Sequence, residues 1–94
     1  MKTLPQAFKV AAPDDSMAPR LKAGQVAEFE VGLELRPGVG VIVRDTEGAP
    51  CIRRCRRVRG AWEAYAEDSD NHLPFPIAAD QVMAVLVGVH ARWG

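Results

Sequence analysis

The sequence predicts a mostly β domain, and two observations carry that prediction. Proline and glycine recur so closely before residue 61 that the pieces between them are shorter than a typical helix. Between these breakers lie runs rich in strand-forming residues. The predicted strands are 26–31, 39–44, 51–58, 61–66 and 82–90. We expect one short helical turn after Ser16, because no breaker follows Pro19 until Gly24.

A hairpin is the most specific local prediction. Arg59 and Gly60 have the character of a two-residue loop that joins 51–58 to 61–66. The resulting register pairs arginines with aromatic and acidic residues, which favours cation–π contacts and a cross-strand ion pair. The predicted pairs are Val58 with Ala61, Arg57 with Trp62, Arg56 with Glu63, and Arg54 with Tyr65.

Length and charge narrow the range of partners. The 94 residues allow one domain, 1–94, and leave no room for an added helix-turn-helix domain. Twelve basic and twelve acidic side chains cancel, so no general attraction to nucleic acid or an anionic membrane is expected. The longest apolar stretch, 82–89, is far shorter than the roughly 20 residues of a spanning helix. We therefore expect a cytoplasmic protein with no membrane association.

Two cysteines and two histidines provide no metal or cofactor site. On one strand the Cα atoms of Cys51 and Cys55 would lie about 13 Å apart, beyond the reach of a disulfide. Their spacing lacks the second pair that a zinc site needs, and His72 and His90 are distant in sequence. We expect free, buried thiols, no metal and no cofactor.

Five arginines occur in the seven residues 53–59, which raises the hypothesis of direct nucleic-acid binding. Strand alternation sends Arg53, Arg57 and Arg59 to one face and Arg54 and Arg56 to the other. Acidic residues follow on the next segment. The favoured interpretation is a solvated, internally paired face that does not bind nucleic acid.

The closing run 82–89 is almost entirely apolar, which suits a strand covered on both faces. Two interpretations remain open. One is a symmetric homodimer that covers the outer face, and the other is a central strand wholly inside the monomer.

An ordered series of motifs surrounds Ser16. Its members are Phe8-Lys9-Val10, Asp14-Asp15-Ser16-Met17-Ala18-Pro19, Leu21, Gly24, Val26, Leu35-Arg36-Pro37-Gly38, the strand 39–43, Ile52-Arg53-Arg54, Asn71, Pro76-Ile77 and the closing strand 85–89. Over about residues 7 to 91, this series resembles the C-terminal domain of the LexA and phage-repressor family.

The resemblance implies a compact, twisted β-sheet domain of the LexA and signal-peptidase type, in which a serine and a lysine cleave the protein's own chain. Ser16 would be the nucleophile, flanked by the turn residues Asp15 and Met17. Backbone N–H groups near Asp15 and Ser16 would hold the oxyanion. Position 53 would hold the lysine base.

The residue at position 53 is arginine. Deprotonating a guanidinium at neutral pH costs about 8 kcal/mol or more, whereas a lysine lies roughly three pKa units from neutrality and burial can supply that shift. Asp14 also stands where the family has glycine, and no Ala-Gly or Cys-Gly bond precedes Ser16. We expect Ser16 to be a turn residue and Arg53 to be a buried partner of Asp14 or Asp15; the alternative is a solvent-facing Arg53.

The resemblance implies a role in phage or SOS-type transcriptional regulation, exerted through dimerisation or through binding to a DNA-binding repressor protein. The missing lysine predicts a defect in self-cleavage. The alternative hypothesis is an active serine peptidase that uses Ser16 with an unidentified base. For His72 and His90, which titrate near neutrality, ordinary surface roles are favoured over that of the base.

Overall fold

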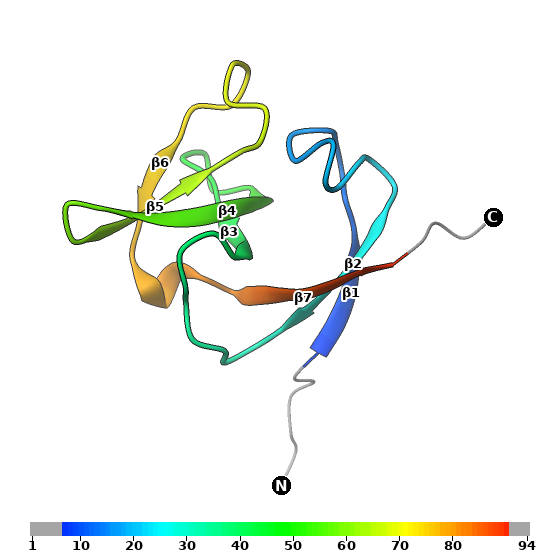
Figure 1. The fold of residues 1–94 in the computed structure, drawn as a ribbon, viewed down its shortest axis with the longest axis horizontal. Helices are drawn as coiled ribbons and strands as arrows, with labels where there is room; N and C mark the ends of the chain where they lie inside the picture. The colour runs from blue at the N-terminus through cyan, green and yellow to red at the C-terminus, as the bar shows by residue number, and fades with distance from the viewer. Residues whose placement is uncertain (1–6, 91–94) are drawn as a thin grey trace, which may run out of the picture.

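The computed structural model describes residues 7–90 as a single seven-stranded antiparallel sheet with no α-helix among them (Figure 1). The strand order is β1-β2-β7-β3-β4-β5-β6. The strands are β1 (Ala7–Ala11), β2 (Val26–Glu30), β3 (Gly40–Arg44), β4 (Pro50–Val58), β5 (Ala61–Tyr65), β6 (Phe75–Ile77) and β7 (Ala84–His90), with one 3-10 turn, η1 (Ala79–Gln81).

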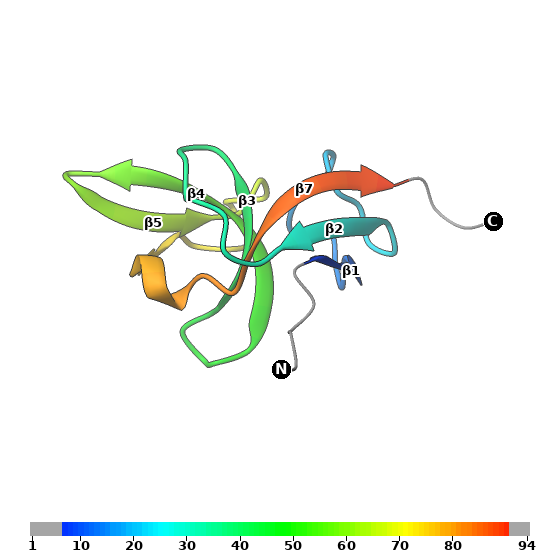
Figure 2. The same ribbon diagram turned by 90° about the horizontal axis from the view of Figure 1, so that it is seen from below.

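The sheet curls into a half-barrel instead of lying flat (Figures 1 and 2). Strands β1, β2 and β7 form one end, and β4, β5 and β6 form the other. Strand β3 joins the two ends by pairing with both β7 and β4. The hairpin of β4 and β5 extends away from the rest of the sheet (Figure 2).

All five predicted strands are present, and no end differs from the prediction by more than two residues. Strands β1 and β6 and the turn η1 were not predicted from the sequence. The helical turn expected after Ser16 was wrong, because non-helical turns occupy that segment. Strand β1 forms by pairing all five of its residues with β2, and β6 has three residues with Pro76 at their centre. Both depend on a partner strand and carry weak local signals.

The register predicted for the β4–β5 hairpin is confirmed at all four pairs. The Arg57 guanidinium lies 5.1 Å from the centre of the Trp62 ring, and Arg56 forms an ion pair with Glu63 at 2.7 Å. The Tyr65 ring instead contacts the guanidinium of its diagonal neighbour Arg56, which lies 4.6 Å from the ring centre. Arg54, directly opposite Tyr65, is hydrogen-bonded to Glu67.

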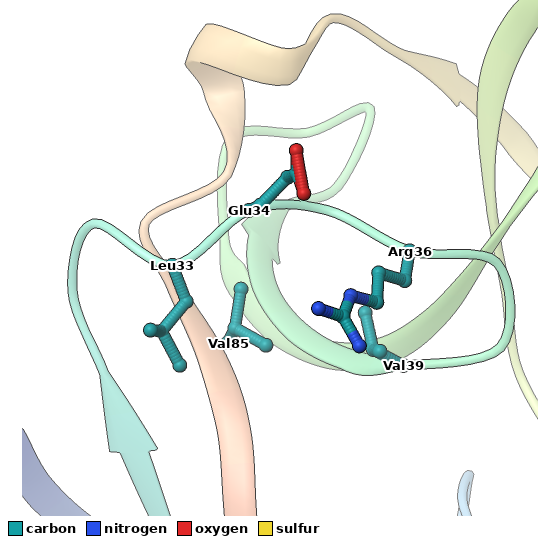
Figure 3. A pocket seen from close by; sticks show the side chains of 5 residues that line it. All are labelled: Leu33, Glu34, Arg36, Val39 and Val85. Atoms are coloured by element: carbon teal, nitrogen blue, oxygen red, sulfur yellow. The ribbon is translucent and has the colours of Figure 1, made fainter.

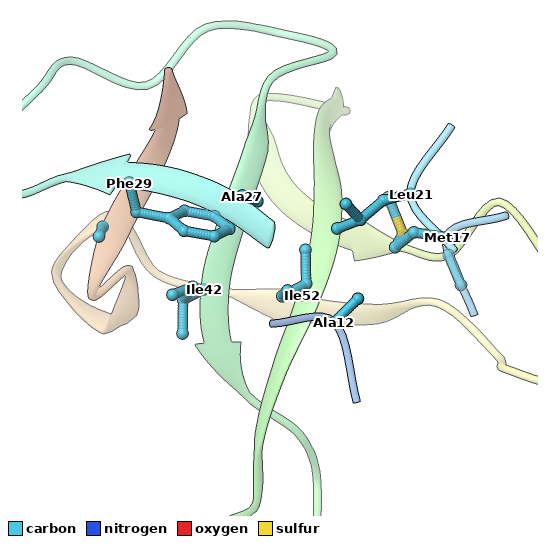
Figure 4. Close-up of a cluster of buried hydrophobic side chains, with 9 residues drawn as sticks. Ala12, Met17, Leu21, Ala27, Phe29, Ile42 and Ile52 are labelled. Atoms are coloured by element: carbon cyan, nitrogen blue, oxygen red, sulfur yellow. The ribbon is translucent and has the colours of Figure 1, made fainter. Parts of the chain in front are cut away.

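Alternate residues of the central strands build a core on each face of the sheet. One cluster contains Phe29, Ile42 and Ile52, and the other contains Val41, Val43 and Cys55. Met17 and Leu21, from the connection between β1 and β2, join the first cluster (Figure 4). This packing holds that connection, which we call the serine loop (residues 12–25), against β4.

Candidate functional site

The serine loop is closed at its base by backbone hydrogen bonds. The Ala12 N–H donates to Gln25 O at 2.8 Å, and the Gly24 N–H donates to Ala12 O at 2.9 Å. Gly24 has a φ of 84°, in the left-handed region where a residue without a Cβ is favoured. A turn bond from the Ala18 N–H to Asp15 O then folds the chain tightly around Ser16.

Ser16 and Arg53, which are 37 residues apart in sequence, are in direct contact. The Arg53 Nη1 atom donates to Ser16 Oγ at 2.9 Å and to Ile52 O at 2.8 Å. Only 4% of Ser16 and 7% of Arg53 are exposed. The hydroxyl oxygen that would attack a carbonyl is therefore the acceptor of a bond from a buried cation.

The expected carboxylate partner of Arg53 was wrong, and so was the solvent-facing alternative. Among residues 7–90, Arg53 forms no ion pair. The two candidate carboxylates are used by the backbone of the serine loop. Asp14 Oδ1 accepts from the Ser16 N–H at 3.0 Å, and Asp15 Oδ1 accepts from the Ala23 N–H at 2.8 Å.

Asp14 bears on two requirements of catalysis by Ser16, which are removal of the hydroxyl proton and stabilisation of an oxyanion. Hydrogen bonds from the Ser16 side chain and backbone lower the pKa of Asp14, with a further contribution from the charge of Arg53. A carboxylate with a lowered pKa is a weak base at neutral pH. Because Asp14 also accepts the Ser16 N–H, a carboxylate competes for a donor that an oxyanion would need.

The loop between β5 and β6 brings His72 next to Arg53. The Asp68 N–H donates to Ser16 O at 2.9 Å and ties this loop to the serine loop. His72 Nδ1 lies 3.4 Å from Arg53 Nη2. Within the described chain there is no hydrogen bond between His72 and Ser16, so Arg53 separates the imidazole from the hydroxyl.

For His72, the sequence favoured a surface role over that of the base. The sequence feature that could have placed His72 near the site is the adjacent Asn71, which belongs to the motif series that resembles the repressor family. Asn71 Nδ2 donates to Asp68 Oδ2 at 2.9 Å, on the same loop that contacts Ser16.

A hollow of about 500 Å³ opens beside Arg53 and His72. The β3–β4 turn lines one side, and the loop before β6 lines the other. Its lining residues include Asp45, Glu47, Arg53, His72, Leu73 and Phe75. Arg53 is thus buried on the serine side and also contributes to the wall of an open site.

A smaller hollow of about 210 Å³ lies at the connection between β2 and β3 (Figure 3). Leu33, Val39 and Val85 give it an apolar floor, and the Arg36 side chain extends over it. None of its lining residues belongs to the serine loop or to the loop of His72.

Most of the arginine run is engaged within the molecule. Arg54 donates to Gly38 O and to Glu67, and the bond to Glu67 raises the pKa of Arg54. Arg56 is paired with Glu63, and Arg57 donates to Gly60 O. Within residues 53–59, Arg54 and Arg56 are therefore paired with carboxylates, while Arg57 contacts a carbonyl oxygen and the Trp62 ring.

Both cysteines are free thiols, as the spacing predicted. Cys55 is buried and its Sγ atom is 3.3 Å from Arg36 O, while Cys51 is half-buried. Burial raises the pKa of both thiols, which disfavours the reactive thiolate. No cluster of three or more metal-ligating side chains occurs between residues 7 and 90.

No helix within residues 7–90 has the length and apolar character needed to span a bilayer. Comparison with protein-family models and with curated proteins finds no match.

Proposed function

We propose that this protein is a non-catalytic relative of the C-terminal domain of LexA and phage repressors, which regulates transcription by self-association or by binding a repressor. The single observation that carries the proposal is the hydrogen bond from Arg53 Nη1 to Ser16 Oγ. A cleaving domain needs a neutral base at this position, and the chain has a permanent cation there.

The environment of Ser16 supports an inert hydroxyl in a second way. Its N–H is bound to Asp14, and the imidazole of His72 contacts Arg53 instead of the serine. Activation of the nucleophile and stabilisation of the oxyanion are therefore both opposed by contacts of the folded chain.

Strand β7 supplies a surface for self-association. Val87 and Val89 are 49% and 46% exposed, although β7 lies inside the sheet between β2 and β3. Exposed apolar side chains on a central strand are a feature of surfaces that pack against a partner. An antiparallel, twofold arrangement of two copies of β7 would cover these valines on both chains.

Val87→Glu tests this surface. Introducing an unpaired carboxylate into an apolar interface should weaken the dimer at least about tenfold. Sedimentation equilibrium of the purified protein gives the dissociation constant. Val58→Glu is the matched control, because Val58 is 41% exposed at the tip of the β4–β5 hairpin, away from β7. A monomeric parent protein, or equal weakening by both variants, would contradict self-association through β7.

A further inference from the structure

Arg53 has donor capacity that its contacts do not use. The buried Nε atom has no hydrogen-bond partner, and the guanidinium contacts a hydroxyl oxygen, a carbonyl oxygen and an imidazole nitrogen. Within residues 7–90 no carboxylate pairs with it. A buried cation without a directly paired carboxylate is costly, so an anionic ligand at this position would be favoured.

Arg53 and His72 both line one hollow, which gives such a ligand a way to approach the guanidinium. The Nη2 edge of Arg53 is the one near His72, and both residues line the hollow of about 500 Å³. This volume lies in the range of pockets that hold small ligands. The Nη2 N–H that does not face His72 can donate a charge-assisted hydrogen bond to a carboxylate oxygen.

The other residues that line the hollow indicate which chemical group would accompany the carboxylate of a bound ligand. Leu73 is 81% exposed, and Phe75 is half-buried beside it, so an apolar group has a surface to cover. Asp45 Oδ1 already accepts from the Glu47 and Ala49 N–H groups at 2.9 Å. Glu47 remains as an exposed negative charge in the wall of the hollow.

We propose that this hollow binds a carboxylate attached to an apolar group, either a small organic acid or the C-terminal residue of a peptide, through Arg53 and His72. The proposal deepens the proposed function and rests on it in one respect, the charged state of Arg53. In this arrangement the cation that keeps Ser16 inert is also the anchor for a ligand.

The test is an NMR titration of the full chain with N-acetyl-leucine and with N-acetyl-leucine amide, following the Arg53 Nε–H signal and the amides of residues 71–75. The free acid should bind at least about tenfold more tightly than the amide, because only the acid offers a charge-assisted bond to Arg53. A longer acetylated peptide that ends in leucine shows whether the natural ligand is a small acid or the C-terminus of a peptide. Tighter binding of the peptide indicates a chain end, and equal binding indicates a small acid.

Substitutions in the hollow test whether the preference for the acid over the amide arises there. Arg53→Met should abolish the preference for the acid, His72→Ala should weaken acid binding severalfold, and Glu47→Gln should strengthen it by removing a like charge. Arg57→Met is the matched control and should leave affinity unchanged, because Arg57 lies on the hairpin against Trp62.

Equal binding of acid and amide, or no binding of either at millimolar concentration, would overturn the carboxylate site. The His72→Ala and Glu47→Gln variants keep the test valid if Arg53→Met does not fold. A reactive Ser16 would contradict the proposed function, whereas loss of the acid preference contradicts only the ligand.

Discussion

Arg53→Lys is expected to make Ser16 reactive, raising its rate of covalent labelling by a fluorophosphonate at least about 100-fold, the lower range for a positioned general base. The side chain at position 53 is almost fully buried, and burial lowers the pKa of a lysine. A neutral amine can accept the hydroxyl proton, whereas the present guanidinium donates to the same oxygen. Intact-mass spectrometry with time measures the rate.

Arg53→Met is the control for this gain, because it removes the cation without supplying a base. It should stay unreactive. Adding Asp14→Gly to Arg53→Lys should raise the rate further, since it frees the Ser16 N–H from the Asp14 carboxylate. If folded Arg53→Lys labelled no faster than Arg53→Met, the proposal that the missing amine keeps Ser16 unreactive would be contradicted.

Gly40→Ala is expected to lower the free energy of unfolding by about 1–3 kcal/mol, the range for overpacking a filled core. A Cβ atom at position 40 would lie 2.8 Å from Leu86 Cδ2 and 3.0 Å from Leu86 Cβ. The second atom is fixed to the backbone of β7, so a change of rotamer cannot relieve that contact. The strain therefore falls where β3 passes close to β7, at the centre of the half-barrel.

Gly88→Ala is the matched control for Gly40→Ala. Gly88 is also on a strand, and a Cβ atom there would have no neighbour within 4 Å. Its unfolding free energy should stay within about 0.5 kcal/mol of the parent value. Urea denaturation of both variants provides the comparison. Equal losses would show that the cost arises from alanine in a strand and not from Leu86.

The strands that the sequence predicted are those with strong local signals. The β4–β5 hairpin has a two-residue loop and complementary cross-strand pairs, and its register was confirmed throughout. Strand β1 carries no comparable signal, because its stability comes from pairing with β2 and from packing of Phe8 and Val10 on the core. Long-range pairing of that kind cannot be predicted from local patterns.

The site was only partly predictable for a similar reason. The motif series placed Ser16 and position 53 together, and the structure has them in contact. The partner of Arg53 was wrong because Asp14 and Asp15 are adjacent to backbone donors of their own loop, which they bind instead. The proximity of His72 depends on the path of the loop after β5, which is set by the bond from Asp68 to Ser16.

The most direct test of the central claim is treatment of the unsubstituted protein with an excess of fluorophosphonate at mildly alkaline pH, followed by intact-mass spectrometry beside Ser16→Ala. The account predicts that the two spectra match and that neither protein carries an adduct. A stoichiometric adduct on the unsubstituted protein that is absent from Ser16→Ala would contradict it, because the hydroxyl bonded to Arg53 would then be a working nucleophile.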